Sequence, residues 1–484
     1  MSELPPPRLP PGWRWRSLGE LLTDIEAGKS FKCDERPPTA SDIGVVKVSA
    51  VTWGEFDEHE SKTCTDPSRV DPHLFIQAGD FLFSRANTIK LVGAAVVVGA
   101  VSGRLMLSDK ILRLRFAEDV DPSWVLYVLR SSWGRAEIER LATGNQESMR
   151  NIGQDRIRQI RIPWVQHAEQ KRIVAEIEKQ FTRLDTGVEA LRRLQAHLRR
   201  YRAAMLTGAL GGRLVPSEAS LARAEGRDFD SGEALLNAVL SARKELHARA
   251  GVKGKYVEPA GPTAGLDRLP EGWTWATLGQ LAWDSGYGTS EKCDYAGVGQ
   301  PVLRIPNIAR GMIDVADLKR ARGDLDLVEG ESLAPGDLLV VRTNGSLDLL
   351  GRGAVVEGRF SEPTYFASYL IRFRLPAMFQ LARWVGLVWQ SPFVRHIIER
   401  SASNSAGQYN VNLKALSAVP VPIPPVAEQA RIIAELERRA SNADALESVA
   451  TANLLRARRL RAAVLCKAFE GSLATAEMPD RISA

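Results

Sequence analysis

The sequence predicts an α+β protein built from two homologous mixed α/β domains, each followed by a long helix. Three observations lead to this fold class: an internal repeat of domain size, short apolar runs separated by Gly, Pro and Asp in the first part of each repeat, and an apolar seam at helical spacing in its last part. A length of 484 residues also exceeds what a single core normally holds.

The repeat is defined by short motifs that recur in the same order. LPPGWRWRSLGELL begins at Leu9 and LPEGWTWATLGQLA begins at Leu269, 260 positions later. GDFLFSRAN from Gly79 is matched by GDLLVVRTN from Gly336, 257 positions later. Solenoid repeats span only about 20–50 residues, so the nearly constant long spacing indicates duplication of a whole domain. We name the two stretches the first copy (Leu9–Leu214) and the second copy (Leu269–Leu473).

Each copy ends in a region whose apolar residues keep one face over many helical turns. Such a face needs a partner, and the equivalent helix of the other copy is the simplest one, so we expect an antiparallel coiled coil with a pseudo-twofold axis. In the alternative, each helix packs only on its own domain. The expected seam contains Ile173, Ile177, Phe181, Leu184, Leu191 and Leu198 in the first helix, and Ile432, Leu436, Leu446 and Leu460 in the second.

These patterns divide the chain into five parts. We expect a first globular domain over 1–163, a first long helix over 164–215, a helical segment and linker over 216–265, a second globular domain over 266–424, and a second long helix with a tail over 425–484.

Composition and charge narrow the function only slightly. The net charge of +6 suits a polyanionic partner, although many proteins share such a balance. The four cysteines show no metal-ligand spacing, so we expect reduced thiols and no bound metal. Neither a membrane span nor a secretory leader is expected from the apolar pattern, and the protein is expected in the cytoplasm.

Motifs for several enzyme chemistries are missing from the sequence. It contains no amino-methyltransferase tetrapeptide, no phosphate-binding G-x-x-x-x-G-K-[ST] loop, no HExxH and no G-x-S-x-G elbow. Their joint absence favours a binding protein over an enzyme.

The order of the motifs resembles a known family. LPxGW, a set of strands, AEQxRI at the start of a long helix and RAAxL near its end, repeated twice around GKYVEP, is similar to the specificity subunits of type I restriction–modification systems. The resemblance implies that each globular part is a target recognition domain that reads one half of a split DNA site. It also implies that the helices set the spacer and dock the methyltransferase subunits.

The same resemblance implies partners and cofactors. The partners would be double-stranded DNA, two modification methyltransferase subunits and a restriction/translocase subunit. S-adenosylmethionine, ATP and Mg²⁺ would belong to those subunits, and this chain would bind no cofactor and perform no catalysis.

The strongest candidates for DNA contact follow one strand at matching points of the two copies. These are Arg85 with Asn87 and Arg342 with Asn344. Arginine pairs with guanine and asparagine with adenine in the major groove. The structural alternative is an arginine that bonds only to loop carbonyls.

Further candidates lie in polar segments. Gln408, Tyr409 and Asn410 precede the last strand of the second copy; Arg150 and Asn151 are the nearest residues in the first copy, and the counterpart of Gln408 is open. Lys32 and Lys292 could contact phosphate, although a solvated turn lysine is the plainer reading.

Two other functions compete with DNA recognition. A scaffold could use the coiled coil to assemble proteins while its domains bind peptides or sugars. An unrecognised nuclease or methyltransferase would need activity from this chain alone, which the missing motifs disfavour.

Overall fold

A computed structural model describes residues 9–146, 149–249, 256–263, 265–323, 332–376, 381–405 and 407–473. Parts of three predicted features lie outside the described residues: positions 254–255 of the GKYVEP joint, positions 147–148 of the first polar segment, and the tail after position 473. The chain forms two compact units, one of residues 1–193 with 450–484 and the other of residues 194–449.

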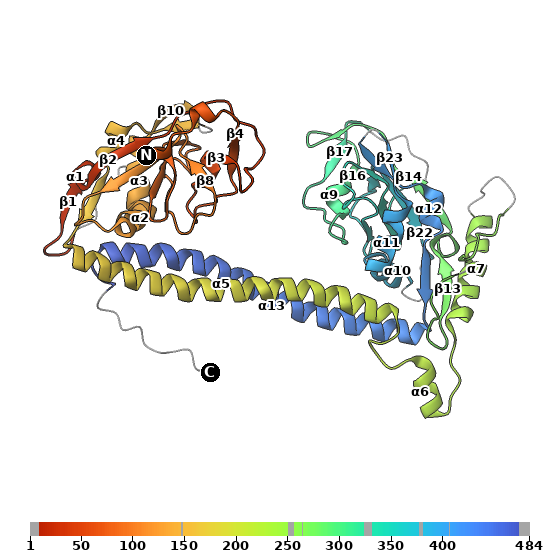
Figure 1. Ribbon diagram of the computed structural model, residues 1–484. Helices are drawn as coiled ribbons and strands as arrows, with labels where there is room; N and C mark the ends of the chain where they lie inside the picture. The colour runs from red at the N-terminus through yellow and green to blue at the C-terminus, as the bar shows by residue number, and fades with distance from the viewer. Residues whose placement is uncertain are drawn as a thin grey trace. The chain divides into compact units, whose positions relative to one another are not determined.

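The first copy is built around a four-stranded antiparallel sheet, with smaller sheets beside it (Figure 1). Its strand order is β2 (Leu22–Ala27), β9 (Ile111–Phe116), β5 (Phe81–Ser84), β7 (Ala95–Val97). The smaller sheets are β4 (Ser61–Cys64), β3 (Ile43–Val46), β8 (Arg104–Met106); β1 (Arg14–Ser17), β12 (Arg161–Trp164); and β10 (Thr143–Gln146), β11 (Met149–Asn151), β6 (Ala86–Asn87).

Short helices connect these strands in the first copy. They are α1 (Leu18–Leu21), α2 (Pro122–Arg130), α3 (Ser132–Leu141) and α4 (Gln154–Arg158), with 3₁₀ turns at Val48–Ala50, Pro67–Arg69 and Pro72–Leu74. The start of α2 is fixed by its sequence: the Asp121 side chain accepts a bond from Ser123 N, and Pro122 occupies the first turn, where no N–H is needed.

The second copy repeats this arrangement. Its main sheet has the order β14 (Asp284–Tyr287), β22 (Leu370–Arg374), β18 (Asp337–Val341), β20 (Gly353–Val355). The others are β15 (Cys293–Asp294), β17 (Lys319–Ala321), β16 (Pro301–Leu303), β21 (Tyr365–Phe366); β13 (Thr274–Thr277), β25 (Pro420–Ile423); and β19 (Thr343–Asn344), β24 (Gln408–Asn410), β23 (Ser403–Ser405). The short helices are α8 (Leu278–Leu281), α9 (Ile305–Ile308), α10 (Leu381–Trp389), α11 (Pro392–Ser401) and α12 (Leu413–Ser417).

The central strand β5 is apolar on both faces because it lies between two layers. Phe81 and Phe83 join a core formed with α2, whereas Leu82 joins a core formed with β3 and β8. This alternation follows from the two-residue period of a strand, and it explains the continuous apolar run FLF. In the second copy, Leu338 and Leu339 of β18 divide in the same way between two cores.

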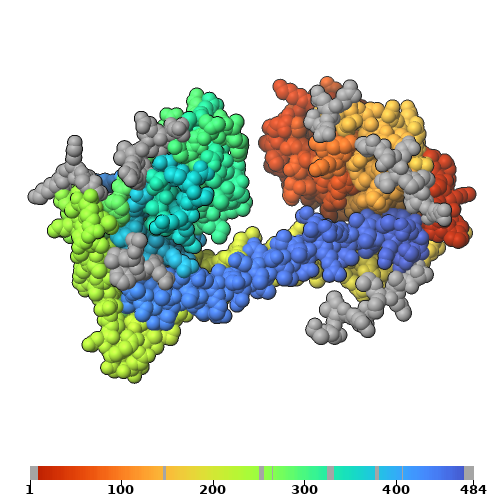
Figure 2. All heavy atoms as spheres, turned by 180° about the vertical axis from the view of Figure 1, so that it is seen from behind, coloured from red at the N-terminus to blue at the C-terminus, as the bar shows by residue number. Residues whose placement is uncertain are grey.

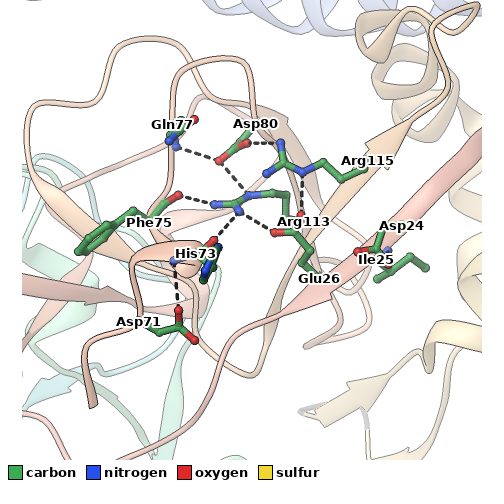
Figure 3. Close-up of polar contacts among 10 residues, drawn as sticks. All are labelled: Asp24, Ile25, Glu26, Asp71, His73, Phe75, Gln77, Asp80, Arg113 and Arg115. Carbon is green, nitrogen blue, oxygen red and sulfur yellow. Dashed lines mark hydrogen bonds and ion pairs between the residues drawn. The ribbon is translucent and has the colours of Figure 1, made fainter. Parts of the chain in front are cut away.

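A cluster of charged side chains joins three strand regions of the first copy (Figure 3). Arg113 is 1% exposed, and its guanidinium bonds Glu26 at 2.6 Å and Asp80 at 2.9 Å. Arg115 bonds the same two carboxylates at 2.8 and 3.2 Å. Burial acts to raise the pKa of Glu26, but the bonds from Arg115 and Arg113 outweigh it and hold this pKa below its ordinary value.

The long helices α5 (His167–Leu210) and α13 (Val426–Phe469) pack against each other in antiparallel fashion. In the first unit, Ile173 near the start of α5 shares a core with Leu465 near the end of α13. In the second unit, Met205 near the end of α5 shares a core with Ile432 near the start of α13. The prediction of an antiparallel helix pair is therefore confirmed. Each helix also packs on its own globular part, so the two packing modes considered from the sequence occur together.

Burial along the helices corrects part of the expected seam. Of the expected residues, Ile173, Ile177, Leu198, Ile432 and Leu436 are buried, and Phe181, Leu184 and Leu191 are half-buried. Leu446 and Leu460 are instead 50% and 43% exposed. The buried residues in this part of α13 are Ala443, Ala450 and Ala457, spaced by seven.

The reason for this correction is the size of the seam residues. The buried residues of this stretch of α13 are alanines, and charged residues of α13 in the same region form ion pairs with α5. Arg202 of α5 bonds Glu447 at 2.6 Å, and Arg461 of α13 forms an ion pair with Asp185 of α5. The expected seam was therefore wrong at Leu446 and Leu460.

The segment between the copies packs on the second copy. It contains α6 (Glu218–Glu225) and α7 (Gly232–Arg249), drawn in yellow-green in Figure 2. Leu235 and Val239 of α7 enter the second-copy core. Glu428, at the start of α13, is buried and accepts bonds from the Glu218 backbone N–H at 2.8 Å and from Trp273 Nε1 at 3.0 Å. The connecting segment is thus part of the second unit.

Among the described helices, none combines the length and the apolar character that a membrane span requires. The four cysteines are all free thiols.

Candidate nucleic-acid interface

One small three-stranded sheet in each copy collects most of the candidate DNA-contact residues. In the first copy, β6 pairs with β11 so that Asn87 lies opposite Arg150. In the second copy, β19 pairs with β24 so that Asn344 lies opposite Tyr409. Segments far apart in the sequence therefore form one polar surface in each copy.

The backbone of the leading arginine is held on both sides in each copy. Arg85 N donates to Lys110 O at 3.0 Å, and Arg85 O accepts from Ile152 N at 2.9 Å. Arg342 makes the same two bonds at 2.9 Å each, to Tyr369 O and from Val411 N. The two bonds fix the point from which each side chain leaves the strand.

Three arginines of these sheets make no side-chain hydrogen bond or ion pair with any residue that the structure describes: Arg85, Arg150 and Arg342. The Nε atoms of Arg150 and Arg342 are buried and lack an acceptor there. Other arginines of the fold do bond loop carbonyls, as Arg135 does to Val92 O at 2.7 Å. The alternative role for Arg85 and Arg342, bonding to loop carbonyls, is therefore not seen among the described residues. The N–H donors of both side chains remain available for a ligand.

The amides around these arginines are partly engaged in local turns. Asn87 Oδ1 accepts from Thr88 N at 2.8 Å, and Asn344 Oδ1 accepts from Ser346 N at 2.7 Å. Asn410 Nδ2 donates to Gln408 O at 3.3 Å. Each amide nitrogen of Asn87 and Asn344 is still free of described partners, so both side chains keep donors for base edges or phosphates.

Strand register gives the counterpart of Gln408. Gln408 lies opposite Ser405 next to the turn of its hairpin, and Met149 lies opposite Gln146 at the matching place. Asn151 then matches Asn410, since both pair with the first residue of the neighbouring strand. The first copy therefore has an exposed thioether where the second has an amide, and no polar residue there could have been found from the sequence.

Lys32 and Lys292 lie in neither of these sheets. Both lysines are exposed, and each lies two residues before an aspartate that is outside these sheets, Asp34 and Asp294 respectively. Asp34 forms an isolated bridge to Thr63, and Asp294 belongs to β15.

Sequence reasoning missed a cavity of about 400 Å³ in the first copy that is rich in lysine. Four of its lining residues are Lys29, Lys47, Lys62 and Lys110. Lys110 is also the residue whose carbonyl binds Arg85 N, so the cavity adjoins the polar sheet. No sequence motif marks these lysines because they come from four separate segments.

No group of three or more potential metal ligands occurs among the described residues. The chemistry that these sites offer is hydrogen bonding and charge. Each copy presents one such site, so the fold holds two sites built on equivalent strands.

The chain is similar to known specificity subunits over nearly its whole length. Over 98% of its length it is 26% identical to the type I restriction enzyme StySPI specificity subunit of Salmonella potsdam, of which it covers 93%. The same identity and coverages hold for the EcoKI specificity subunit of Escherichia coli strain K12. Over nearly its full length, the chain is therefore similar to specificity subunits of type I restriction enzymes.

A solved structure shares the fold of this chain. A chain from a solved type I R–M system is 21% identical, with a TM-score of 0.59 over 96% of this chain and 100% of that one. No protein-family model matches the sequence.

Proposed function

We propose that this protein is the non-catalytic specificity subunit of a type I restriction–modification complex, and that each copy reads one half of a two-part DNA target. The observation that carries the proposal is an arginine at the same strand end of both copies, Arg85 and Arg342, whose side chain makes no hydrogen bond or ion pair with a described residue. Guanidinium groups with free donors recognise guanine edges and phosphates, and a duplicated site requires a duplicated target.

The division of labour follows the predicted boundaries. Residues 1–163 and 266–424 are the two recognition domains, and the segment 216–265 joins them. The helical parts, 164–215 and 425–484, set the unread spacer and dock two methyltransferase subunits. A restriction/translocase subunit completes the complex, and S-adenosylmethionine, ATP and Mg²⁺ are held by the partner subunits. The supports are the full-length similarity to specificity subunits and the fold shared with a chain of a solved type I R–M system.

Within each domain, two kinds of contact cooperate. Arg85, Arg342 and the amides beside them reach base edges and so select sequence. Lysines such as Lys110 neutralise phosphates, which positions the protein on the duplex and makes binding depend on salt.

A domain exchange tests the assignment of copies to half-sites. Residues 9–163 would be replaced by the equivalent domain of a relative that has a different target, and the full chain would be expressed with its methyltransferase subunits. We expect sequencing of methylated bases to show a change in one half-site only, with the other half-site and the spacer retained. A change in both halves, or in neither, would contradict the proposal.

The competing scaffold function gives a different result in a binding assay. A scaffold predicts no complex with duplex DNA, or one insensitive to salt, whereas the proposal predicts an affinity that falls steeply as salt rises.

A further inference from the structure

In the second copy, Arg342 makes a cation–π contact with an aromatic ring. The guanidinium carbon of Arg342 lies 4.8 Å from the ring centroid of Tyr287, which is 52% exposed at the end of β14. Cation–π contacts hold a guanidinium over the ring without using any of its N–H donors. The side chain of Arg342 is thus oriented while its hydrogen-bonding capacity stays available.

Both ends of this contact are fixed by the main sheet. Tyr287 lies opposite Ile371 in the β14–β22 pair, and the Arg342 backbone bonds Tyr369 and Val411. The backbone position of Arg342 is thereby fixed relative to the strand that pairs with β14. A guanidinium restrained in this way loses little freedom when it meets a planar ligand edge, which favours a specific contact over a loose ionic one.

We infer that Arg342, positioned by the ring of Tyr287, reads a guanine in the half-site of the second copy. The inference rests on the proposed function and adds the identity of one base. Guanine presents two acceptors, O6 and N7, on its major-groove edge, and the two terminal nitrogens of one guanidinium match them. Adenine and thymine place an amino or a methyl group there, and cytosine an amino group.

In the first copy, Arg85 makes no such cation–π contact with a described residue, so the two copies of the chain can be compared directly. Ala27 occupies the register position of Tyr287, opposite Leu112 of β9, and Lys110 occupies that of Tyr369. Arg85 therefore has no aromatic ring at either of these two positions. The guanine-reading role is assigned to Arg342 alone.

The plain alternative is a stack that only covers surface. It predicts that loss of Arg342 changes stability slightly and leaves sequence preference intact. The Arg342 guanidinium makes no hydrogen bond or ion pair to any described residue. On this alternative, its exposed N–H groups would bond only to water.

The test uses the full chain assembled with its methyltransferase subunits and a randomised double-stranded DNA library. The variants are Arg342→Ala, Arg342→Lys, Tyr287→Ala and Tyr287→Phe. We expect both Arg342 variants to lose about tenfold or more of the preference for guanine at one position of one half-site. Tyr287→Ala should lose part of it, and Tyr287→Phe should keep it because the ring remains. Lysine keeps the charge but not the planar pair of donors, so it separates base reading from phosphate binding.

The other half-site serves as a control in every experiment. It should be read normally by all four variants, which shows that the chain is folded and assembled. If Arg342→Ala leaves all preferences unchanged, or weakens binding equally for every sequence, the inference is wrong while the proposed function stands. If the unaltered complex selects no sequence at all, the proposed function fails and the inference fails with it.

Discussion

Asn87 of β6 lies directly opposite Arg150 of β11, although four strands (β7 to β10) and two helices (α2 and α3) separate them along the chain. The equivalent pair in the second copy is Asn344 and Tyr409. Each polar site is therefore created by strand pairing. A short strand that follows the central sheet strand (β6 or β19) pairs with a strand near the end of the domain (β11 or β24). The amide is shared by the copies, whereas the residue opposite it differs, so the two sites have a common frame and different chemistry.

Substitution within the first site should separate base reading from phosphate binding. We expect Arg85→Ala to relax sequence preference in the first half-site at a cost of about 1–3 kcal/mol against the preferred base. Lys110→Ala should instead weaken binding to all sequences and reduce the slope of log affinity against log salt by about 1. Equilibrium binding to matched and mismatched duplexes at several salt concentrations measures both. Identical behaviour of the two variants would refute this division of roles.

The corrected helix seam makes a prediction about two leucines of α13. Leu436 is 5% exposed within a core, so Leu436→Ala should lower the free energy of unfolding by about 2–5 kcal/mol. Leu446 is 50% exposed, and Leu446→Ala should change it by no more than about 0.5 kcal/mol. Urea denaturation followed by circular dichroism compares them. Equal losses would return Leu446 to the seam.

The alanine row can be tested in the opposite direction. Ala450 is 1% exposed, and a larger side chain there would force the helices apart, so Ala450→Leu should destabilise the protein by about 1–3 kcal/mol. Val449→Leu places the same new side chain at the adjacent position, which is 58% exposed, and should be nearly neutral. Thermal unfolding of the two variants measures the difference; a stabilising Ala450→Leu would show that the seam has room.

Loss of one charge from the cluster of Figure 3 should be costly. The Asp80 side chain is 3% exposed and bonds both Arg113 and Arg115, so Asp80→Asn leaves buried cationic charge without its full counterion. We expect a loss of about 3–5 kcal/mol in the free energy of unfolding. As a control, Glu176→Gln breaks the more exposed pair with Lys179, 3.5 Å apart, and should cost much less. Comparable losses in chemical denaturation would show that burial of the cluster carries no special weight.

The same cluster predicts a dependence on pH. The pKa of Glu26 is lowered in the folded protein because its bonds to Arg115 and Arg113 outweigh the effect of burial. As the pH falls, a glutamate of the unfolded chain takes up its proton near pH 4.3, roughly, whereas Glu26 of the folded protein does so at a lower pH. The stabilisation that Glu26 contributes is therefore full above about pH 4.3 and is lost as the pH falls through the folded pKa. Glu26→Gln should therefore flatten the fall in stability below about pH 5.

Urea unfolding over a pH series measures this effect. Glu55→Gln is the control, since the exposed Glu55 makes no bond to a described residue and its loss should leave the profile unchanged. Profiles of equal steepness for Glu26→Gln and the unaltered protein would show that the carboxylate contributes nothing to acid sensitivity.

The duplicated motifs and the long apolar seam were sufficient to predict the fold class, because both depend on regular spacing along the chain. Glycines end both long helices: Gly212 and Gly471 follow α5 and α13 with φ of 64° and 72°, values that favour glycine. Leu446 and Leu460 were misplaced because helical spacing places several neighbouring residues near the seam, and only the packed structure shows that Ala443, Ala450 and Ala457 are the buried ones.

The candidate site was predictable only in part. Arg85 and Arg342 stood out because they follow the same strand in both copies, and the asparagines beside them followed from the same motif. Tyr287 and Lys110 could not be found, since each reaches the site through strand pairing with distant residues. The match between Met149 and Gln408 likewise required the register of the hairpins.

The most direct measurement is a map of methylated bases in the genome of a cell that expresses this chain with its methyltransferase subunits. The account predicts one two-part motif, with two short specific segments separated by a fixed unread gap. A continuous motif, or two segments at variable separation, would contradict it.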